Sequence, residues 1–217
     1  NREHEIENIA VTTYNAAAGE RPMTVLPKLI RTYPNVIVVR DMVDGEAAKL
    51  LCEQVGEGRL VVAGIRAEEA PEALLRVLFM KVPAEEFAPA ITAVLNVRLV
   101  RKLCDSCKVA YEPTADVLQK LGLPAGKIQA LYREPKPEEV DKICPACGGL
   151  GYLGRTGIFE LLVVDDKMRE VLVEQPKLEL VKKAARAAGM RNLQEEGILM
   201  VAKGVTSIAE LMRVLKG

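Results

Sequence analysis

Four of the five cysteines in this chain stand in two identically spaced pairs. The first pair is Cys104 and Cys107, and the second is Cys144 and Cys147. A C-x-x-C pair can turn both sulfurs toward one point, and two such pairs together supply the four thiolates that a structural Zn²⁺ prefers. The sequence therefore predicts a zinc site with these four ligands. Since sulfur fills every coordination position, we expect the metal to stabilise the fold and not to catalyse.

Other chemistries of paired cysteines stay open at this point. Two disulfides are disfavoured because nothing else in the chain is typical of a secreted protein. Buried inert thiols would not be expected to fall twice into the same tight spacing. A redox use of C-x-x-C would need one pair free of metal and at the N-terminus of a helix. Bound zinc and free thiols, counted in the native protein, separate these cases.

The cysteine pairs enclose residues 108–143, and glycines follow the second pair. We expect the enclosed segment to be a loop or small excursion that metal closes at its base. The glycine-rich stretch 148–157 lets the backbone fold close to the sulfurs.

The composition of the 217 residues excludes several function classes. Lys plus Arg and Asp plus Glu balance at 30 each, and the chain has three Phe, five Tyr and no Trp. Basic grooves and stacking platforms for nucleic acid need both positive charge and aromatics. The apolar runs are too short to cross a bilayer, and the start lacks a signal-peptide layout. We expect a cytoplasmic protein that contacts neither nucleic acid nor the membrane directly. Because the sequence begins with Asn1 and not with Met, we also expect it to be a fragment.

The first half of the chain alternates strand and helix patterns. Residues 6–15 predict a strand, and residues 24–32 predict a helix capped by Thr24 with Pro27 in its first turn. Val36–Val39 predicts a strand buried on both faces, and Asp41 follows its carboxyl end. The remaining expected elements are a helix over 45–55, a strand over 60–65, a helix over 71–80, and a helix or helix plus strand over 87–103. This rhythm predicts an α/β fold with three layers and a mostly parallel sheet.

The second half is predicted to be helical after the cysteines. Asp165 is a candidate cap for a helix that ends near Val173, and a second helix is expected over 178–188. Asn192 with Glu195, and Ser207 with Glu210, have capping-box spacing and predict two more helices.

Several of these motifs together resemble the secretion ATPases that drive type IV pilus assembly and type II secretion. The resemblance is carried by Arg98-Leu-Val-Arg101, by the four cysteines, and by the stretch from Gly151 to Glu160. It implies the C-terminal half of a RecA-like P-loop NTPase domain with a zinc module. It also implies ATP and Mg²⁺ as cofactors, a hexameric ring, and an inner-membrane platform protein as partner. The chain would then work on the cytoplasmic side of that membrane and associate with it only through partners.

The same resemblance indicates a divergent nucleotide site. No G-x-x-x-x-G-K-[ST] loop occurs in the chain. Arg40-Asp41 occupies the positions of the Gly-Glu that ends the Walker B strand in the family. Arg59 and Arg66 occupy the positions of the two histidines of the family's histidine box. Asp41 is the candidate catalytic residue. Arg59, Arg66, Arg98 and Arg101 are candidate nucleotide-binding residues.

The chain is expected to consist of three consecutive segments. Residues 1–100 are expected to be a partial nucleotide-binding domain, residues 101–157 the zinc module, and residues 158–217 a helical region. The expected function is part of a motor ATPase subunit that couples ATP hydrolysis to assembly of pilin-like fibres, with a degenerate nucleotide site. The alternative is a stand-alone zinc ribbon that serves as a binding or scaffold module.

Overall fold

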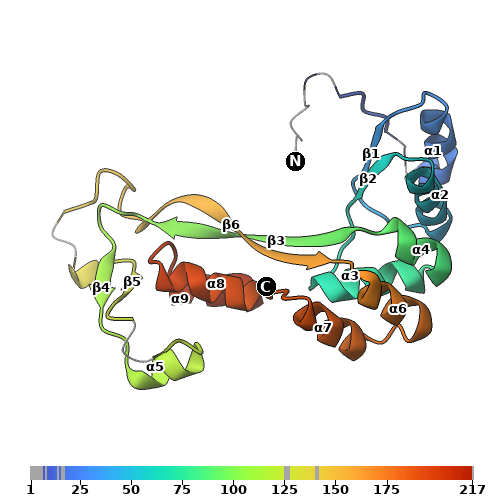
Figure 1. Cartoon of the computed structure of the whole chain (residues 1–217). Helices are drawn as coiled ribbons and strands as arrows, with labels where there is room; N and C mark the ends of the chain where they lie inside the picture. The colour runs from blue at the N-terminus through green and yellow to red at the C-terminus, as the bar shows by residue number, and fades with distance from the viewer. Residues whose placement is uncertain are drawn as a thin grey trace. The chain divides into compact units, whose positions relative to one another are not determined.

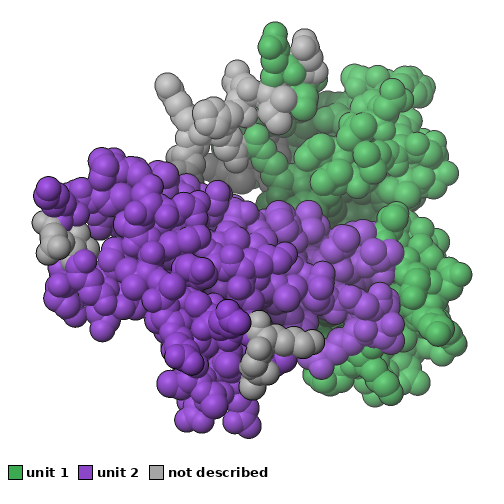
Figure 2. Space-filling view, turned by 60° about the vertical axis from the view of Figure 1, so that its left-hand side comes forward, with its two compact units in different colours: residues 1–92, 164–184 green, residues 93–163, 185–217 purple. Residues whose placement is uncertain are grey.

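The computed structural model describes residues 7, 9–13, 15, 18–124, 128–139 and 142–216. By their contacts the residues divide into two units, which Figure 2 shows in different colours. Unit 1 comprises residues 1–92 and 164–184, and unit 2 comprises residues 93–163 and 185–217. Both units are therefore discontinuous in sequence. The three consecutive segments expected from the sequence stay a prediction about functional parts, since the packing units do not follow them.

Unit 1 begins with a helix whose predicted start was wrong. Helix α1 spans Pro22–Ile30 and starts at Pro22, so Pro27 lies inside the helix and not in its first turn. Thr24 is not the N-cap; its hydroxyl donates to the carbonyl of Arg21. A proline at the first helical position has no unsatisfied N–H, which explains the earlier start. The strand predicted over 6–15 is absent from described residues 9–13, and its other parts lie largely outside the described residues.

The predicted parallel strand pair is confirmed in unit 1. Strand β1 (Val36–Val39) pairs in parallel with β2 (Leu60–Ala63), with Ile37 opposite Val61. Burial on both faces was wrong, because Ile37 is 2% exposed whereas Val38 is 63% exposed. Side chains alternate between the two faces of a strand, and the described helices of unit 1 leave the face of Val38 uncovered.

Helices pack on one face of this pair and beside it in unit 1 (Figure 1). Asp44 caps α2 by accepting a hydrogen bond from the N–H of Glu46. Asp165 caps α6 in the predicted way, accepting from the N–H of Met168 at 2.8 Å. Lys182 bridges α7 to Glu69 just before α3, with 2.6 Å between Nζ and Oε1. The helices are α2 (Gly45–Gly56), α3 (Ala70–Phe79), α4 (Ala84–Ala90), α6 (Asp166–Glu174) and α7 (Leu178–Ala187).

A long antiparallel ribbon organises unit 2. Strand β3 (Ala93–Leu103) pairs with β6 (Tyr152–Val163), with Val97 opposite Phe159 and an irregularity between Arg101 and Leu103. Helices α8 (Leu193–Ala202) and α9 (Ile208–Lys216) lie beside the ribbon in Figure 1. Their packing buries a core of six apolar residues, Val100, Leu131, Ile158, Leu193, Val201 and Leu211.

The other face of the ribbon carries exposed apolar side chains. These occupy alternate positions on both strands, and the register places Leu95 opposite Leu161 and Val97 opposite Phe159. They are Leu95, Val97, Leu99, Phe159, Leu161 and Val163, each between 39% and 59% exposed.

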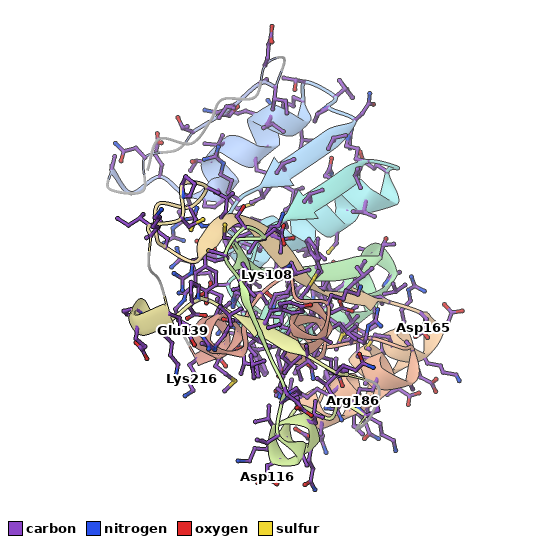
Figure 3. The ribbon with its side chains drawn as sticks, turned by 90° about the vertical axis from the view of Figure 1, so that its left-hand side faces the viewer. Lys108, Asp116, Glu139, Asp165, Arg186 and Lys216 are labelled. Atoms are coloured by element: carbon purple, nitrogen blue, oxygen red, sulfur yellow. The ribbon has the colours of Figure 1, made fainter. Side chains whose placement is uncertain are left out.

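The segment between the cysteine pairs is a small structured excursion. Strands β4 (Val109–Tyr111) and β5 (Leu131–Arg133) pair antiparallel. Short helix α5 (Ala115–Lys120) follows β4 in the sequence and carries Asp116 in its first turn (Figure 3). A 3-10 turn, η2 (Pro137–Glu139), follows β5. Leu131 is fully buried in the core of unit 2, so packing as well as the cysteines anchors the excursion.

Candidate metal centre

The structure brings the four predicted cysteines together. Their Sγ atoms all lie within 4.8 Å of one another. Cys104 Sγ is 4.0 Å from Cys144 Sγ, and Cys107 Sγ is 3.7 Å from Cys147 Sγ. A disulfide needs about 2.05 Å, so these are free thiols. Tetrahedral zinc with Zn–S bonds of about 2.3 Å separates its sulfurs by roughly 3.8 Å, which matches the closest pairs.

Both pairs sit in the same kind of backbone turn. The N–H of Lys108 donates to the carbonyl of Cys104 at 2.9 Å, and the N–H of Gly148 donates to the carbonyl of Cys144 at the same distance. Each turn points its two thiols to one side. The turns are joined because the N–H of Cys104 donates to the carbonyl of Gly151 at 2.9 Å. We call the two cysteine turns, residues 104–108 and 144–148, the knuckles. They therefore hold the end of β3 and the start of β6 beside each other.

Glycines are required after the second pair. Gly148, Gly149 and Gly151 have φ values of 62°, 83° and 72°, a region that other residues rarely adopt. A Cβ on Gly151 would also lie 2.6 Å from Cβ of Glu134. The predicted role of the glycine-rich stretch in folding the backbone beside the sulfurs is thus confirmed.

Ionisation of the thiols depends on their surroundings. Burial raises the pKa of the Cys107 thiol to about 12, and hydrogen bonds with the other thiols add to this. Burial also opposes ionisation of Cys147. There, hydrogen bonds from the backbone of Gly151 and Gly149 and from neighbouring thiols prevail and hold the pKa at about 7. N–H donors of this kind stabilise thiolate ligands of a metal.

The donor set fits one structural metal ion. Four converging sulfurs, with Cys104 and Cys147 buried, suit tetrahedral soft-ligand coordination. Cys104, Cys107, Cys144 and Cys147 would hold the ion, and no coordination position would remain open for water or substrate. The ion would supply a cross-link between the knuckles.

Among the predicted nucleotide residues, Asp41 and Arg66 lie together. Each follows the carboxyl end of its strand, Asp41 after β1 and Arg66 after β2. Because the strands are parallel, these ends meet, and Arg66 Nη2 lies 3.3 Å from Asp41 Oδ2. The Arg66 side chain is 88% exposed. The pair is therefore a solvated ion pair at the end of the sheet where ligands bind in open α/β proteins.

Arg59 lies at the opposite end of β2. It precedes Leu60, the first residue of that strand, and pairs with Glu57 and with the side chain of Gln54. Its side chain is only 13% exposed. The structure thus does not bring Arg59 to Asp41, and the two arginines of the divergent histidine box are separated by the length of the strand.

The two arginines of β3 both have partners within unit 2. Arg98 donates to the side chain of Asn96 at 3.0 Å and to the carbonyl of Val97 at 3.2 Å. Arg101 donates from Nε and Nη2 to Glu210 at 2.9 and 2.6 Å. Its guanidinium also lies 4.2 Å from the centre of the Tyr152 ring.

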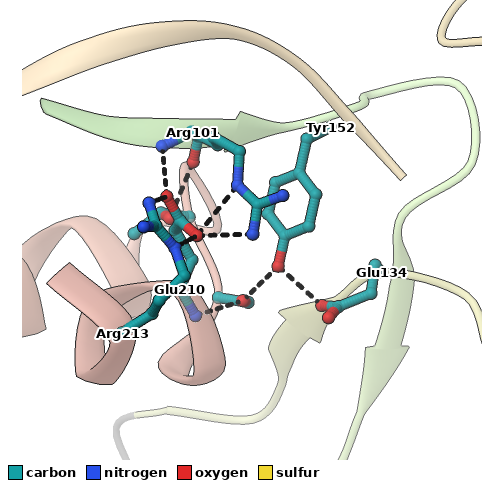
Figure 4. Close-up of polar contacts among 7 residues, drawn as sticks. Arg101, Glu134, Tyr152, Glu210 and Arg213 are labelled. Carbon is teal, nitrogen blue, oxygen red and sulfur yellow. Dashed lines mark hydrogen bonds and ion pairs between the residues drawn. The ribbon is translucent and has the colours of Figure 1, made fainter. Parts of the chain in front are cut away.

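The pairing of Glu210 with two arginines is the contact that sequence reasoning missed. Glu210 is 1% exposed and accepts hydrogen bonds from Arg101 and Arg213 (Figure 4). Hydrogen bonds from Arg213 and then Arg101 hold the pKa of its carboxyl at about 2, against the effect of burial. The spacing of Ser207 and Glu210 predicted a capping box, and Ser207 does accept from the N–H of Glu210. The acidic side chain, however, turns to the arginines.

A family model described as type II/IV secretion system protein matches residues 2–213. The chain belongs to this family. The match extends far beyond the cysteines, so it does not favour the alternative of a stand-alone zinc ribbon. It confirms the resemblance on which the sequence prediction rested.

Curated members of the type II/IV secretion family match almost the whole chain. The type IV pilus assembly ATPase PilB of Thermus thermophilus is 36% identical over 97% of the chain and 23% of its own length. The type II secretion system protein HxcR of Pseudomonas aeruginosa is 33% identical over 99% of the chain and 40% of its own length. The type II secretion system ATPase E of Vibrio cholerae is 30% identical over 99% of the chain and 41% of its own length. The chain thus spans less than half the length of these relatives.

Solved structures of ATPases share the fold. The pilus retraction motor PilT with bound ADP aligns with a TM-score of 0.56 at 15% identity, over 88% of this chain and 42% of that one. The ATPase DotB of Legionella pneumophila gives a TM-score of 0.56 at 14% identity, over 87% and 40%. The α/β, RecA-like fold predicted from the sequence is therefore confirmed. No helix among the described residues has the length and apolar character needed to span a membrane.

Proposed function

We propose that this chain is the C-terminal part of a motor subunit that couples ATP hydrolysis to the assembly of pilin-like fibres in a secretion or pilus machine. The observation that carries the proposal is the family match over residues 2–213, together with PilB and secretion ATPases among the relatives. In this function the tetracysteine centre holds one structural Zn²⁺. ATP and Mg²⁺ would bind to the complete subunit.

The nucleotide chemistry does not reside in these residues alone. Phosphoryl transfer is catalysed by positioning and charge neutralisation, for which P-loop enzymes use an amide cradle, a Lys and a Mg²⁺-binding hydroxyl. The sequence holds no such loop. The Asp41 carboxylate pairs with Arg66, and Arg59 lies at the other end of β2. These observations support a degenerate nucleotide site in this chain.

The partners follow from the same family. We infer that the subunits form a ring, hexameric as in related motors, at the cytoplasmic face of an inner membrane. There the ring would meet a platform protein and touch the membrane only through it.

A comparison of carboxylate variants tests the proposed site. ATP hydrolysis is measured by phosphate release in the full-length protein, with Asp41→Ala set beside Asp166→Ala. Asp166 is a suitable control because it is also a carboxylate in unit 1, fully exposed and paired with Arg169. A degenerate site predicts the same rate in both variants and no hydrolysis by the 217-residue chain. If Asp41→Ala alone abolishes hydrolysis, Asp41 is a working catalytic residue and the degenerate site is refuted.

A further inference from the structure

The turn between α8 and α9, residues 203–207, is held by residues that flank the metal centre. The N–H of Leu103, which directly precedes Cys104, donates to the carbonyl of Val205 at 2.9 Å. The hydroxyl of Thr206 donates to the carbonyl of Arg101 at 2.8 Å. Thr206 is fully buried. The end of β3 that enters the first knuckle is thus fixed to this turn by two hydrogen bonds.

The residue after the first cysteine pair makes another contact with the same turn. Lys108, labelled in Figure 3, donates from Nζ to the carbonyl of Gly204 at 3.3 Å. A Cβ on Gly204 would lie 2.6 Å from the ring of Tyr132, so the turn approaches β5 closely. The Lys108 ammonium lies 5.0 Å from the centre of that same ring.

The strand that leaves the second knuckle also contacts the start of α9. The hydroxyl of Tyr152, the first residue of β6, lies 2.7 Å from the hydroxyl of Ser207 and donates to Glu134 at 2.8 Å (Figure 4). Ser207 is 1% exposed and caps α9 through the N–H of Glu210. Tyr152 directly follows Gly151, whose carbonyl accepts the hydrogen bond from the backbone N–H of Cys104.

Glu210 completes this set of contacts, which we call the clamp. The residues near the cysteines contribute one side of the clamp, and the α8–α9 turn with the start of α9 contributes the other. The first side consists of Arg101, Leu103, Lys108 and Tyr152, and the second of Gly204, Val205, Thr206, Ser207 and Glu210. The buried carboxylate accepts from the backbone N–H of Arg101 at 3.0 Å and from its guanidinium. Each residue on the first side lies within a few positions of a cysteine of the metal centre. The positions of these donors therefore depend on how the two knuckles are held.

The two knuckles contact each other directly as well as through the adjoining pairing of Leu103 with Tyr152 in the ribbon. Between them the described hydrogen bonds include the one from Cys104 N–H to Gly151 and the thiol contacts. A metal ion bound by four sulfurs would replace the weak thiol contacts with bonds to both knuckles. Its loss would remove these bonds and leave the pairing of Leu103 with Tyr152 and the hydrogen bond from Cys104 N–H to Gly151 to hold the start of β6 beside the end of β3.

We propose that Zn²⁺ in the tetracysteine centre controls the docking of α9 onto the β3–β6 ribbon through the clamp. The inference rests on the proposed structural zinc. It gives the metal an effect on the C-terminal helices beyond closing its own excursion. Metal binding and helix docking are then linked, and linkage between two equilibria is reciprocal.

Hydrogen exchange of the 217-residue protein tests the first half of this linkage. Backbone amide exchange is followed by mass spectrometry with Zn²⁺ bound and after removal by a chelator. We expect the amides of α9 to exchange at least tenfold faster without zinc, while those of α2 in unit 1 keep their protection. If α9 exchange is unchanged while the excursion loosens, the metal closes only its own segment and the proposal is overturned. If α2 loses protection as well, the metal supports the whole fold and the proposal is equally overturned.

A pair of tyrosine variants tests the reciprocal half. Tyr152→Phe removes one clamp hydroxyl and leaves Ser207 to cap α9. Tyr111→Phe removes a hydroxyl from β4, outside the clamp, and is the matched control. The variant loses the hydrogen bonds of this hydroxyl to Glu134 and to Ser207, and loss of the buried one to Ser207 corresponds to a change of about fivefold. We expect Tyr152→Phe to speed α9 exchange with zinc bound and to lower the apparent zinc affinity by about that factor, with Tyr111→Phe unchanged.

Zinc affinity is measured by competition with a chromogenic chelator. Unchanged affinity in Tyr152→Phe, despite faster α9 exchange, would show that the clamp is structural and independent of the metal. Zinc content per chain is determined in parallel. A chain that binds no zinc refutes the metal of the proposed function, whereas a zinc-loaded chain in which α9 exchange does not depend on zinc refutes only the link between the metal and α9.

Discussion

In the contact between α8 and α9, Gly197→Ala should either lower or raise the free energy of unfolding, depending on the side chain at position 211. Gly197 lies inside α8, and a Cβ there would be 2.2 Å from Cδ1 of Leu211 and 3.0 Å from its Cδ2. Leu211 is 1% exposed, so it has little room to move. Gly197→Ala gains about 1 kcal/mol of helix propensity. Overpacking costs about 1 to 3 kcal/mol, so the variant should be destabilised by about 1 kcal/mol.

The sign should reverse when the leucine is shortened. Leu211→Ala alone should cost about 2 to 5 kcal/mol, because it removes a buried side chain and leaves a cavity. In that background the methyl group added by Gly197→Ala meets no leucine methyls. The substitution then keeps its gain in propensity and buries a methyl worth about 0.8 kcal/mol. The coupling energy between the two positions should therefore be about 2 to 3 kcal/mol.

Urea unfolding of the four proteins in the double-mutant cycle measures this coupling. Helix content is followed by circular dichroism and the surroundings of the tyrosines by fluorescence, with the slope of the transition compared between variants. Gly56→Ala is the control, because Gly56 ends α2 and no heavy atom lies within 4 Å of a Cβ there. It should have the same small effect with or without Leu211→Ala. Additivity of Gly197→Ala and Leu211→Ala within about 0.5 kcal/mol would refute the packing argument.

Three further outcomes are expected. Metal analysis should find one zinc per chain, and Cys107→Ser should lower that content; equal zinc in both proteins would refute the ligand set. Because the pKa of Glu210 is depressed to about 2, its stabilisation is present above about pH 4.5 and lost as the pH falls toward 2. Glu210→Gln should therefore lower the unfolding free energy by about 2 to 3 kcal/mol at pH 7. If the gap in unfolding free energy between wild type and variant stays the same as the pH falls toward 2, this reasoning is contradicted. Gly64→Ala should cost about 2 kcal/mol in urea unfolding, since its Cβ would lie 2.1 Å from the carbonyl oxygen of Arg40; a neutral effect would show that the strand ends can separate.

Local sequence signals predicted the parts of the fold that local chemistry decides. The cysteine spacing identified the four residues whose sulfurs converge, and the capping box of Asn192 and Glu195 is present with both of its hydrogen bonds. The run of β-branched residues at Val36–Val39 is a strand. In each case the residues that interact are close in sequence or repeat a fixed spacing.

Long-range pairing and exposure could not be predicted in this way. Arg101 and Glu210 are 109 positions apart, and nothing near either residue indicates the other. Val38 has the residue type of a buried strand, yet its exposure depends on which elements cover that face of the sheet. Asp41 and Arg66 could be placed together from the parallel strand order, whereas the separation of Arg59 depended on which end of β2 it occupies.

The excursion between the knuckles, which is closed at its base, is a place where we expect the chain to tolerate an insertion. The entropy of closing a flexible loop grows only with the logarithm of its length, so doubling the loop costs about 0.6 kcal/mol. Gly122, after α5, has a φ of 64° and no heavy atom within 4 Å of a Cβ. A fluorescent or affinity domain inserted after Gly122 would be tethered at a base fixed by Leu131 and the cysteines. The excursion is therefore a natural attachment point for a reporter that leaves both packing units intact.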